Sequence, residues 1–180
     1  MSAKDIATAL QRAHSVLLRR PSAGLQQDAP ATARWRQGTR VVTRHPNGAQ
    51  VLTDMPTELG GTGDQVSPGW LVRAGFAACT ATLIAMVAAE RGITLESVDV
   101  ATSSESDARG LLGMADADGV PVPGGPGNVR TVVRVSARDA SAEDVRAVID
   151  EACRRSPVGC ALQHAVPLAL FVEVDILKAA

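Results

Sequence analysis

The stretch "SPGWLVRAGFAACTATLIAMVAAERG" (67–92) decides the fold of this 180-residue chain. Between Arg73 and Glu90 it carries 16 consecutive uncharged residues, most of them apolar. A membrane-spanning helix needs roughly 18 to 20 such residues. Because the run is shorter than that and rich in alanine, we expect a helix buried in the interior of a folded domain.

The two ends of this segment carry residues that start and stop helices. Ser67 is a suitable N-cap, and Pro68 fits the first helical position, where the missing N–H costs nothing. Gly92 is typical of the residue that follows a helix C-terminus. We therefore predict a helix from Pro68 to about Arg91. It is apolar nearly all round, so it should lie inside the protein rather than on its surface.

Cys79 stands in the middle of this predicted helix, within "GFAACTATL" (75–83). A single buried cysteine is most often a small, inert hydrophobic residue. A reactive thiol needs a cationic or otherwise polar neighbour that favours the thiolate. The local sequence leaves both interpretations open.

Before the central helix, the sequence predicts one amphipathic helix and a three-stranded meander. Apolar residues recur with a period near 3.6 over residues 3–20, and Pro21 ends that helix. Gly38 and the hairpin signal "HPNG" (45–48) then divide an alternating region into strands. The predicted strands are 31–37, 39–44 and 49–54, and a glycine-rich loop follows over 56–69.

After the central helix, the pattern predicts two strands, two helices and a final strand. Ser141 and Asp144 fit a loose capping box at the start of a helix that ends near Arg155. Ser156 is then an N-cap for a short helix that begins at Pro157. The strands are expected over 93–104, 129–138 and 168–176. Strands grouped before and after helices favour an α+β fold over a doubly wound parallel sheet.

The composition narrows the function further. The net charge is −1 and only four residues are aromatic, which gives no electrostatic or base-stacking surface for nucleic acid and no reason to bind an acidic membrane. The three cysteines are too few for a disulfide framework and suit a reducing cytosol. The charged N-terminal region lacks the apolar core of a secretory signal. We expect a cytoplasmic protein of one main domain.

Two other motifs point to no specific chemistry. The sequences "GGTG" (60–63) and "GGPG" (124–127) lack the lysine and hydroxyl residue of a phosphate-binding loop, so we interpret them as turns. Cys160 and His164 have i, i+4 spacing, but two ligands are too few for a zinc ion that takes four. We therefore expect no metal and no resident cofactor.

Three segments together resemble one known family. "RWRQGTRV" (34–41), "TELGGTGDQVSPGWLVRAGFAACTATLIAMVAAERGI" (57–93) and "SAEDVRAVIDEACRRSPVGCALQHAVPL" (141–168) are similar to the osmotically inducible protein C (OsmC) and organic hydroperoxide resistance (Ohr) superfamily. The resemblance covers about residues 30–176 in order. It implies an N-terminal helix and linker over 1–29 and an OsmC-like domain over 30–180.

The resemblance implies a fold, an assembly and an activity. The family is an intertwined homodimer, in which antiparallel sheets from both chains wrap around two central apolar helices. In its peroxidase members, a cysteine on this helix attacks an organic hydroperoxide and becomes a sulfenic acid. A second cysteine then forms a disulfide, and an external dithiol reductant restores the enzyme. Cys79 matches the attacking position.

The family pattern also implies partners for Cys79. An arginine in an Arg-x-Gly setting favours the thiolate and polarises the peroxide, and "RQG" places Arg36 there. The glutamate that holds this arginine is replaced by Gly69, which leaves Glu58, Asp54 or Asp64 as candidates from the loop.

The second cysteine of the family is replaced as well. Ser156 stands at its position, and Cys160, one helical turn further on, is the better substitute than Cys153. The alternative is a purely structural role, in which Cys160 only packs beside its neighbours. Trp35 and Trp70 either fill core space or line an apolar substrate pocket next to Cys79.

Three functions therefore remain in competition. The first is a thiol-dependent peroxidase that reduces organic hydroperoxides through Cys79 in oxidative-stress defence. The second, motivated by Gly69 and Ser156, is a noncatalytic dimer that binds a small apolar or thiol ligand. The third is a one-cysteine redox sensor or peroxidase, whose sulfenic acid reacts directly with an external thiol.

Overall fold

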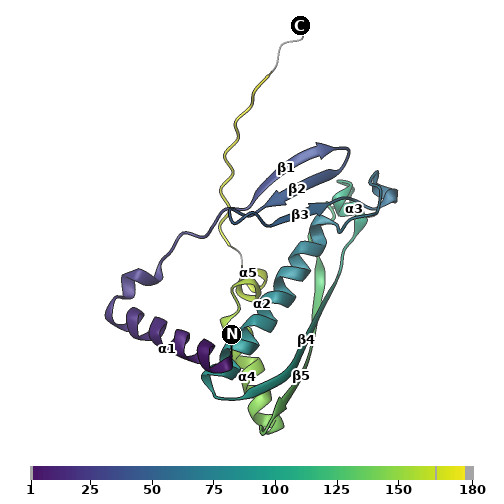
Figure 1. Ribbon diagram of the computed structural model, residues 1–180. Coiled ribbons are helices and arrows are strands. Elements are labelled where there is room, and N and C mark those ends of the chain that lie inside the picture. Colours follow the sequence, from purple (N-terminus) through teal and green to yellow (C-terminus); the bar gives the residue numbers. More distant parts are fainter. Residues whose placement is uncertain (1, 165, 177–180) are drawn as a thin grey trace.

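The computed structural model describes residues 2–164 and 166–176, and it has the predicted α+β architecture (Figure 1). A three-stranded sheet lies near the N-terminal end of the central helix α2. A long two-stranded sheet runs along α2, and the helices α1, α4 and α5 pack against α2 as well. The core is thus built around one helix.

The N-terminal helix α1 spans Ala3–Arg19, as its period predicts. It begins with a capping box in which the Ser2 hydroxyl accepts from the Asp5 N–H and the Asp5 side chain accepts from the Ser2 N–H. A short 3-10 helix, η1, follows over Pro21–Gly24. No residue of α1 is fully buried, so α1 lies on the surface of the domain, against α2.

The first sheet is an antiparallel meander in the order β1–β2–β3. Its strands are β1 (Thr32–Gln37), β2 (Arg40–Arg44) and β3 (Gln50–Thr53). The "HPNG" hairpin forms as predicted, because the His45 N–H donates to the Ala49 carbonyl and Gly48 adopts a φ of 94°. A second 3-10 helix, η2 (Thr57–Leu59), interrupts the glycine-rich loop.

The central helix α2 spans Pro68–Glu90. Ser67 is its N-cap residue, although its side chain makes no capping hydrogen bond. Gly92 ends the helix with a φ of 70°, and the N–H groups of Gly92 and Ile93 donate to the carbonyls of Ala89 and Ala88. This is the Schellman arrangement expected of a glycine at that position.

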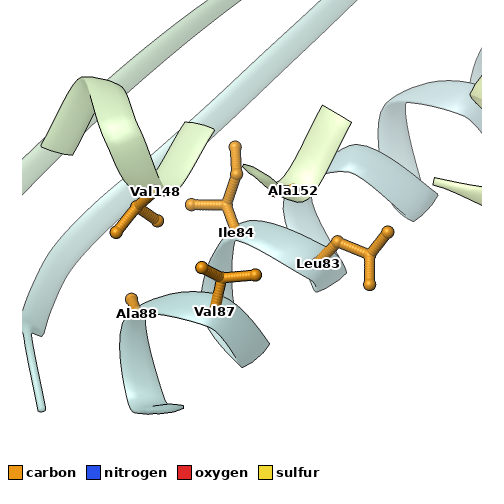
Figure 2. Packing of buried hydrophobic residues seen from close by; sticks show 6 residues of the cluster. All are labelled: Leu83, Ile84, Val87, Ala88, Val148 and Ala152. Atoms are coloured by element: carbon orange, nitrogen blue, oxygen red, sulfur yellow. The ribbon is translucent and has the colours of Figure 1, made fainter. Parts of the chain in front are cut away.

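One face of α2 forms the core of the domain (Figure 2). By length and composition alone α2 could cross a membrane, but its inner face packs here against β4, β5 and α4 as a core helix does. The buried cluster consists of Leu83, Ile84, Val87, Ala88, Val148 and Ala152. The outer face carries Trp70, Val72 and small residues, and it is exposed in the single chain. The prediction that α2 lies inside the protein therefore holds for one face only.

The second sheet pairs β4 (Thr94–Glu105) with β5 (Gly127–Arg138) in antiparallel register. Valines from both strands face the core cluster. The connection between the strands contains a short helix, α3 (Ala108–Leu111), which the sequence did not predict. Helix α4 (Ala142–Arg155) then begins with the predicted Ser141–Asp144 capping box, and α5 spans Pro157–Gln163.

The strand predicted over 168–176 is wrong for this single chain. Residues 166–176 form no strand, and they extend away from the body of the molecule (Figure 1). A strand exists only when its backbone groups pair with a neighbour. The alternating sequence of this segment has the pattern of a strand, but no sheet edge of the described chain pairs with it.

Candidate functional site

Cys79 lies on α2, about 16 Å along the helix from Pro68 at a rise of 1.5 Å per residue. Its side chain is half-buried and packs against the apolar core cluster. The cysteine is free. It therefore combines an apolar setting with partial access to solvent.

Ser156 is the polar neighbour of this thiol. Its hydroxyl donates a hydrogen bond to Cys79 Sγ over 3.3 Å, and the serine is fully buried. Ser156 ends α4 and caps α5, since its Oγ also accepts from the Gly159 N–H over 3.0 Å. Among the described residues, Cys79 and Ser156 are thus two sequence-predicted site residues from different helices that the structure joins by a side-chain hydrogen bond.

The other two cysteines lie elsewhere on the C-terminal helices. Cys160 is exposed, and its Sγ lies 3.8 Å from the Arg154 carbonyl oxygen. Cys153 is also exposed as a residue, while desolvation of its thiol and the nearby Asp150 raise its pKa. Neither cysteine is hydrogen-bonded to Cys79, and whether either resolves it stays a prediction.

Arg36 and Trp35 project from β1, a strand whose residues are all exposed. The Trp35 Nε1–H donates to the Gly38 carbonyl over 2.8 Å and so braces the β1–β2 turn, with 67% of the residue exposed. Within residues 2–164 and 166–176, Arg36 makes no ion pair and no side-chain hydrogen bond to Glu58, Asp54 or Asp64. The predicted pairing of Arg36 with a loop carboxylate is therefore absent from the single chain.

The loop carboxylates hold a different arginine, Arg40. Its Nε lies 3.3 Å from Asp54 Oδ2, and its Nη2 lies 2.6 Å from Asp64 Oδ1. Thr39 and Thr62 complete this group, which we call the loop network: Thr39, Arg40, Asp54, Thr62 and Asp64. It fixes the glycine-rich loop to the first sheet, just before α2 begins.

The Asp54 carboxylate is the centre of the loop network. It is buried, and it accepts from the Thr39 hydroxyl, from the Thr62 hydroxyl and N–H, and from the Met55 N–H. These hydrogen bonds, with that from Thr39 the largest effect, hold the pKa of Asp54 far below its usual value. The pKa of Asp64 is lowered mainly by the Thr62 hydroxyl and then by Arg40.

The sequence contains a signal for this network that our interpretation did not use. In the β2–β3 hairpin, Val41 pairs with Thr53, so the next pair of positions outward is Arg40 and Asp54. The "HPNG" turn alone sets that register. An opposite-charge pair at facing positions was therefore predictable once the turn was recognised.

Gly69 and Trp70 occupy the first turn of α2. A Cβ atom added at Gly69 would meet no atom within 4 Å, so a larger side chain has room there. Trp70 is 45% exposed and does not fill the core of the single chain. Both residues are exposed in the single chain.

Metal ligands do not gather in the part of the chain that the structure describes. No three histidine, cysteine or acidic side chains come together there in a way that could hold an ion. Cys160 and His164 are joined only by a backbone hydrogen bond, from the His164 N–H to the Cys160 carbonyl.

Comparison with known proteins identifies the fold. Among curated proteins, none matches the sequence of this chain. An OsmC-like protein of Mycoplasma pneumoniae is similar in structure, with a TM-score of 0.64 and 17% identity over 78% of this chain and 91% of that one. A Legionella pneumophila organic hydroperoxide resistance protein OsmC has a TM-score of 0.55 and 22% identity, over 77% and 92% of the two chains.

A third solved structure, an organic hydroperoxide resistance protein from Elizabethkingia anophelis, has a TM-score of 0.56 and 19% identity over 78% of this chain and 91% of that chain. At these identities the likeness establishes the fold alone. The family model described as "OsmC-like protein" matches residues 61–171, which is more than half of the chain and includes Cys79 and Ser156. The chain belongs to the OsmC-like protein family.

Proposed function

We propose that this protein is a thiol-dependent peroxidase that reduces organic hydroperoxides through Cys79, in cytoplasmic defence against oxidative stress. The observation that carries the proposal is the contact between the half-buried Cys79 thiol and the fully buried Ser156 hydroxyl. A thiol that only fills space needs no buried hydrogen-bond donor. The membership in the OsmC-like family and the organic hydroperoxide resistance proteins among the similar structures support a peroxide-resistance or stress-related role.

The chemistry begins with the Cys79 thiolate. Its sulfur attacks the terminal, hydroxyl-bearing oxygen of the hydroperoxide, so an S–O bond forms and the O–O bond breaks. The electron pair leaves with the alkoxide, which takes up a proton and departs as an alcohol. Cys79 is oxidised to a sulfenic acid and the hydroperoxide is reduced. An external thiol reductant then returns the two electrons, and no resident cofactor takes part.

A cation is still needed to favour the thiolate and to polarise the leaving oxygen. Arg36 remains our candidate for this role. The first sheet lies near the start of α2, whereas Cys79 lies about 16 Å along the helix. Among the described residues, Arg36 makes no side-chain hydrogen bond to Cys79, which bonds instead to Ser156. We therefore propose that Arg36 acts on the Cys79 of a second copy, with Trp35 and Trp70 lining the apolar pocket between the copies.

Two features of the single chain support a homodimer. The outer face of α2 exposes Trp70 and Val72 to water. The segment 166–176 exposes a further run of apolar side chains, including Leu168 at 93% and Phe171 at 91%. Apolar surface of this extent is unfavourable in water and marks an interaction site. Light scattering after size exclusion would measure the mass, and a monomer would contradict the proposed assembly.

The activity is tested with purified protein, cumene hydroperoxide and dithiothreitol. We expect turnover by the wild-type protein and none by a Cys79→Ser variant, because a serine hydroxyl does not reduce a peroxide. A Cys153→Ser variant is the matched control, since it removes a cysteine that does not contact Cys79. Equal rates for wild-type protein and Cys79→Ser would overturn the proposal.

A noncatalytic dimer that binds a small apolar or thiol ligand is the second candidate. The observation that favours it is the exposed Arg36, which no acidic side chain of the described residues holds in place. Treatment with one equivalent of cumene hydroperoxide distinguishes the two functions. If mass spectrometry finds Cys79 fully reduced in folded protein, the binding function is favoured over the peroxidase.

A further inference from the structure

The contact between Ser156 and Cys79 has a consequence for how oxidised Cys79 is reduced. We infer that Ser156 is a positioning residue, which stabilises the Cys79 thiolate and occupies the place beside its sulfur where an internal disulfide would form. The sulfenic acid is then reduced by a small external monothiol rather than by a second cysteine of this chain. This inference rests on the proposed peroxidase function.

The hydroxyl proton of Ser156 is directed at the sulfur by the helix cap. Oγ accepts from the Gly159 N–H over 3.0 Å, which fixes the side chain at the start of α5. Its single proton is then donated to Cys79 Sγ over 3.3 Å. A charged sulfur accepts such a bond more strongly than a neutral thiol does. The contact therefore places a fixed hydrogen-bond donor beside the Cys79 sulfur, in addition to the cation that the proposed mechanism needs.

Close packing holds Ser156 against α2. A Cβ atom added at Gly159 would lie 3.1 Å from Ser156 Cβ, 3.2 Å from Ser156 Oγ and 3.3 Å from Phe76 Cε2. Gly159 itself is buried. The absence of a side chain at this position lets α5 approach α2 closely enough for the hydroxyl to reach the sulfur.

The thiols of Cys153 and Cys160 are poorly placed to form a disulfide with oxidised Cys79. Cys160 is exposed and its Sγ lies next to the Arg154 carbonyl oxygen, at the end of α4. The pKa of the Cys153 thiol is raised by its desolvation and by Asp150, which disfavours the thiolate that would have to attack the Cys79 sulfenic acid. The group that touches Cys79 is a hydroxyl, and a hydroxyl cannot form a disulfide.

The reducing steps balance with two molecules of monothiol. The first attacks the sulfur of the Cys79 sulfenic acid, forming an S–S bond and releasing water. The second attacks the external sulfur of this mixed disulfide, so that Cys79 leaves as a thiolate and a low-molecular-weight disulfide forms. The two thiols supply the two electrons that the hydroperoxide removed.

The role of Ser156 in stabilising the thiolate is tested by alkylation, which needs no peroxide. The rate at which iodoacetamide modifies Cys79 is measured against pH in protein that carries Cys153→Ser and Cys160→Ser. We expect Ser156→Ala to slow the alkylation of Cys79 about tenfold on the acidic side of this profile, because the sulfur loses its hydrogen-bond donor. Ser156→Thr, which keeps the hydroxyl, should restore much of the lost alkylation rate.

Ser141→Ala is the matched control for the alkylation experiment. Ser141 is also a helix N-cap, on α4, and its hydroxyl accepts from the Asp144 N–H without contacting Cys79. We expect its profile to equal that of the parent protein. An unchanged alkylation rate in folded Ser156→Ala, or an equal loss of rate in Ser141→Ala, would overturn the positioning role.

The reduction by monothiol is tested with 2-mercaptoethanol. After one equivalent of cumene hydroperoxide, we expect mass spectrometry to find 2-mercaptoethanol bound to Cys79, and turnover to persist in Cys160→Ser. Ser156→Cys should instead form a disulfide with Cys79 and depend on dithiothreitol. A disulfide from Cys79 to Cys160 or Cys153 in the wild-type protein would overturn the inference. If peroxide leaves Cys79 unmodified, the proposed peroxidase fails, while the alkylation profile still decides the role of Ser156.

Discussion

Asp54 and Cys79 are reactive or charged groups that lie at least partly inside the protein, and they differ in how many hydrogen bonds they accept. Asp54 is buried and charged, and four hydrogen bonds from three residues together with Arg40 satisfy it. Cys79 packs against apolar side chains, and among the described residues its sulfur accepts one side-chain hydrogen bond, from the Ser156 hydroxyl. The Asp54 carboxylate, whose hydrogen bonds are all made, holds a loop in place. The Cys79 thiol accepts only one such bond, so its sulfur can still react.

The number of hydrogen bonds that each group accepts indicates a structural role for the loop network and a reactive role for Cys79. A carboxylate that accepts from every side has no remaining site for a substrate, so the loop network is structural. A thiol with a single donor can form the thiolate and still approach a ligand. Substitutions in the two regions should therefore affect different measurements, stability in the first and reactivity in the second.

The largest effect on stability is expected for Asp54→Ala. The change leaves the Thr39, Thr62 and Met55 donors without their acceptor and removes a charge from beside Arg40. Thermal unfolding followed by circular dichroism should show a greater loss than for any substitution below. Asp64→Ala is the control, because Asp64 is half exposed and its removal leaves Asp54 paired. An equal loss for both variants would show that Asp54 has no special part.

A smaller loss is expected when the apolar support of Cys79 is weakened. Ile84→Ala removes a fully buried side chain of the core cluster in Figure 2, which should cost about 3 kcal/mol in the free energy of unfolding. Urea denaturation at fixed protein concentration measures this cost. Thr82→Ala, on the exposed face of α2, is the control. We expect the rate of Cys79 alkylation to rise as well, because the thiol becomes more accessible.

The pH dependence of stability should report on Asp54. Its pKa is lowered in the folded protein from an ordinary value of 3.8, so the unfolded chain binds more protons in the acid range. The contribution of Asp54 is therefore complete well above pH 3.8 and is lost as the pH falls below that value towards the folded pKa. Urea denaturation between pH 6 and pH 3 should show a smaller decline for Asp54→Asn than for wild-type protein. Parallel declines would contradict this account.

The smallest effect is expected at Thr80, next to Cys79. Its Oγ1 is buried and has no hydrogen-bond partner among the described residues. Thr80→Val removes this unpaired hydroxyl and keeps the shape of the side chain, so stability should rise by about 1 kcal/mol. Thr131→Val, which breaks a hydrogen bond between two threonine hydroxyls, should have the opposite sign. A loss of stability in Thr80→Val would show that the hydroxyl finds a partner in the assembled protein.

Most elements of the fold were predictable because their signals are local. The capping residues Ser141 and Gly92 and the "HPNG" turn act within a few residues of their own position, so the sequence fixes those boundaries directly. The segment 168–176 shows the limit of this reasoning. Its alternation predicts a strand, but a strand also needs a partner that the single chain does not provide.

The candidate site also combines features that the sequence predicts with contacts that it does not predict. The sequence by itself determined that Cys79 lies on an apolar helix and that Ser156 begins the short helix α5, since both follow from residue type and spacing. Only the tertiary structure decided that the Ser156 hydroxyl meets the Cys79 sulfur. It also decided that Asp64, which lies outside the hairpin, joins the Arg40–Asp54 pair. Contacts between residues far apart in the chain depend on how whole elements pack, and local patterns carry no record of that packing.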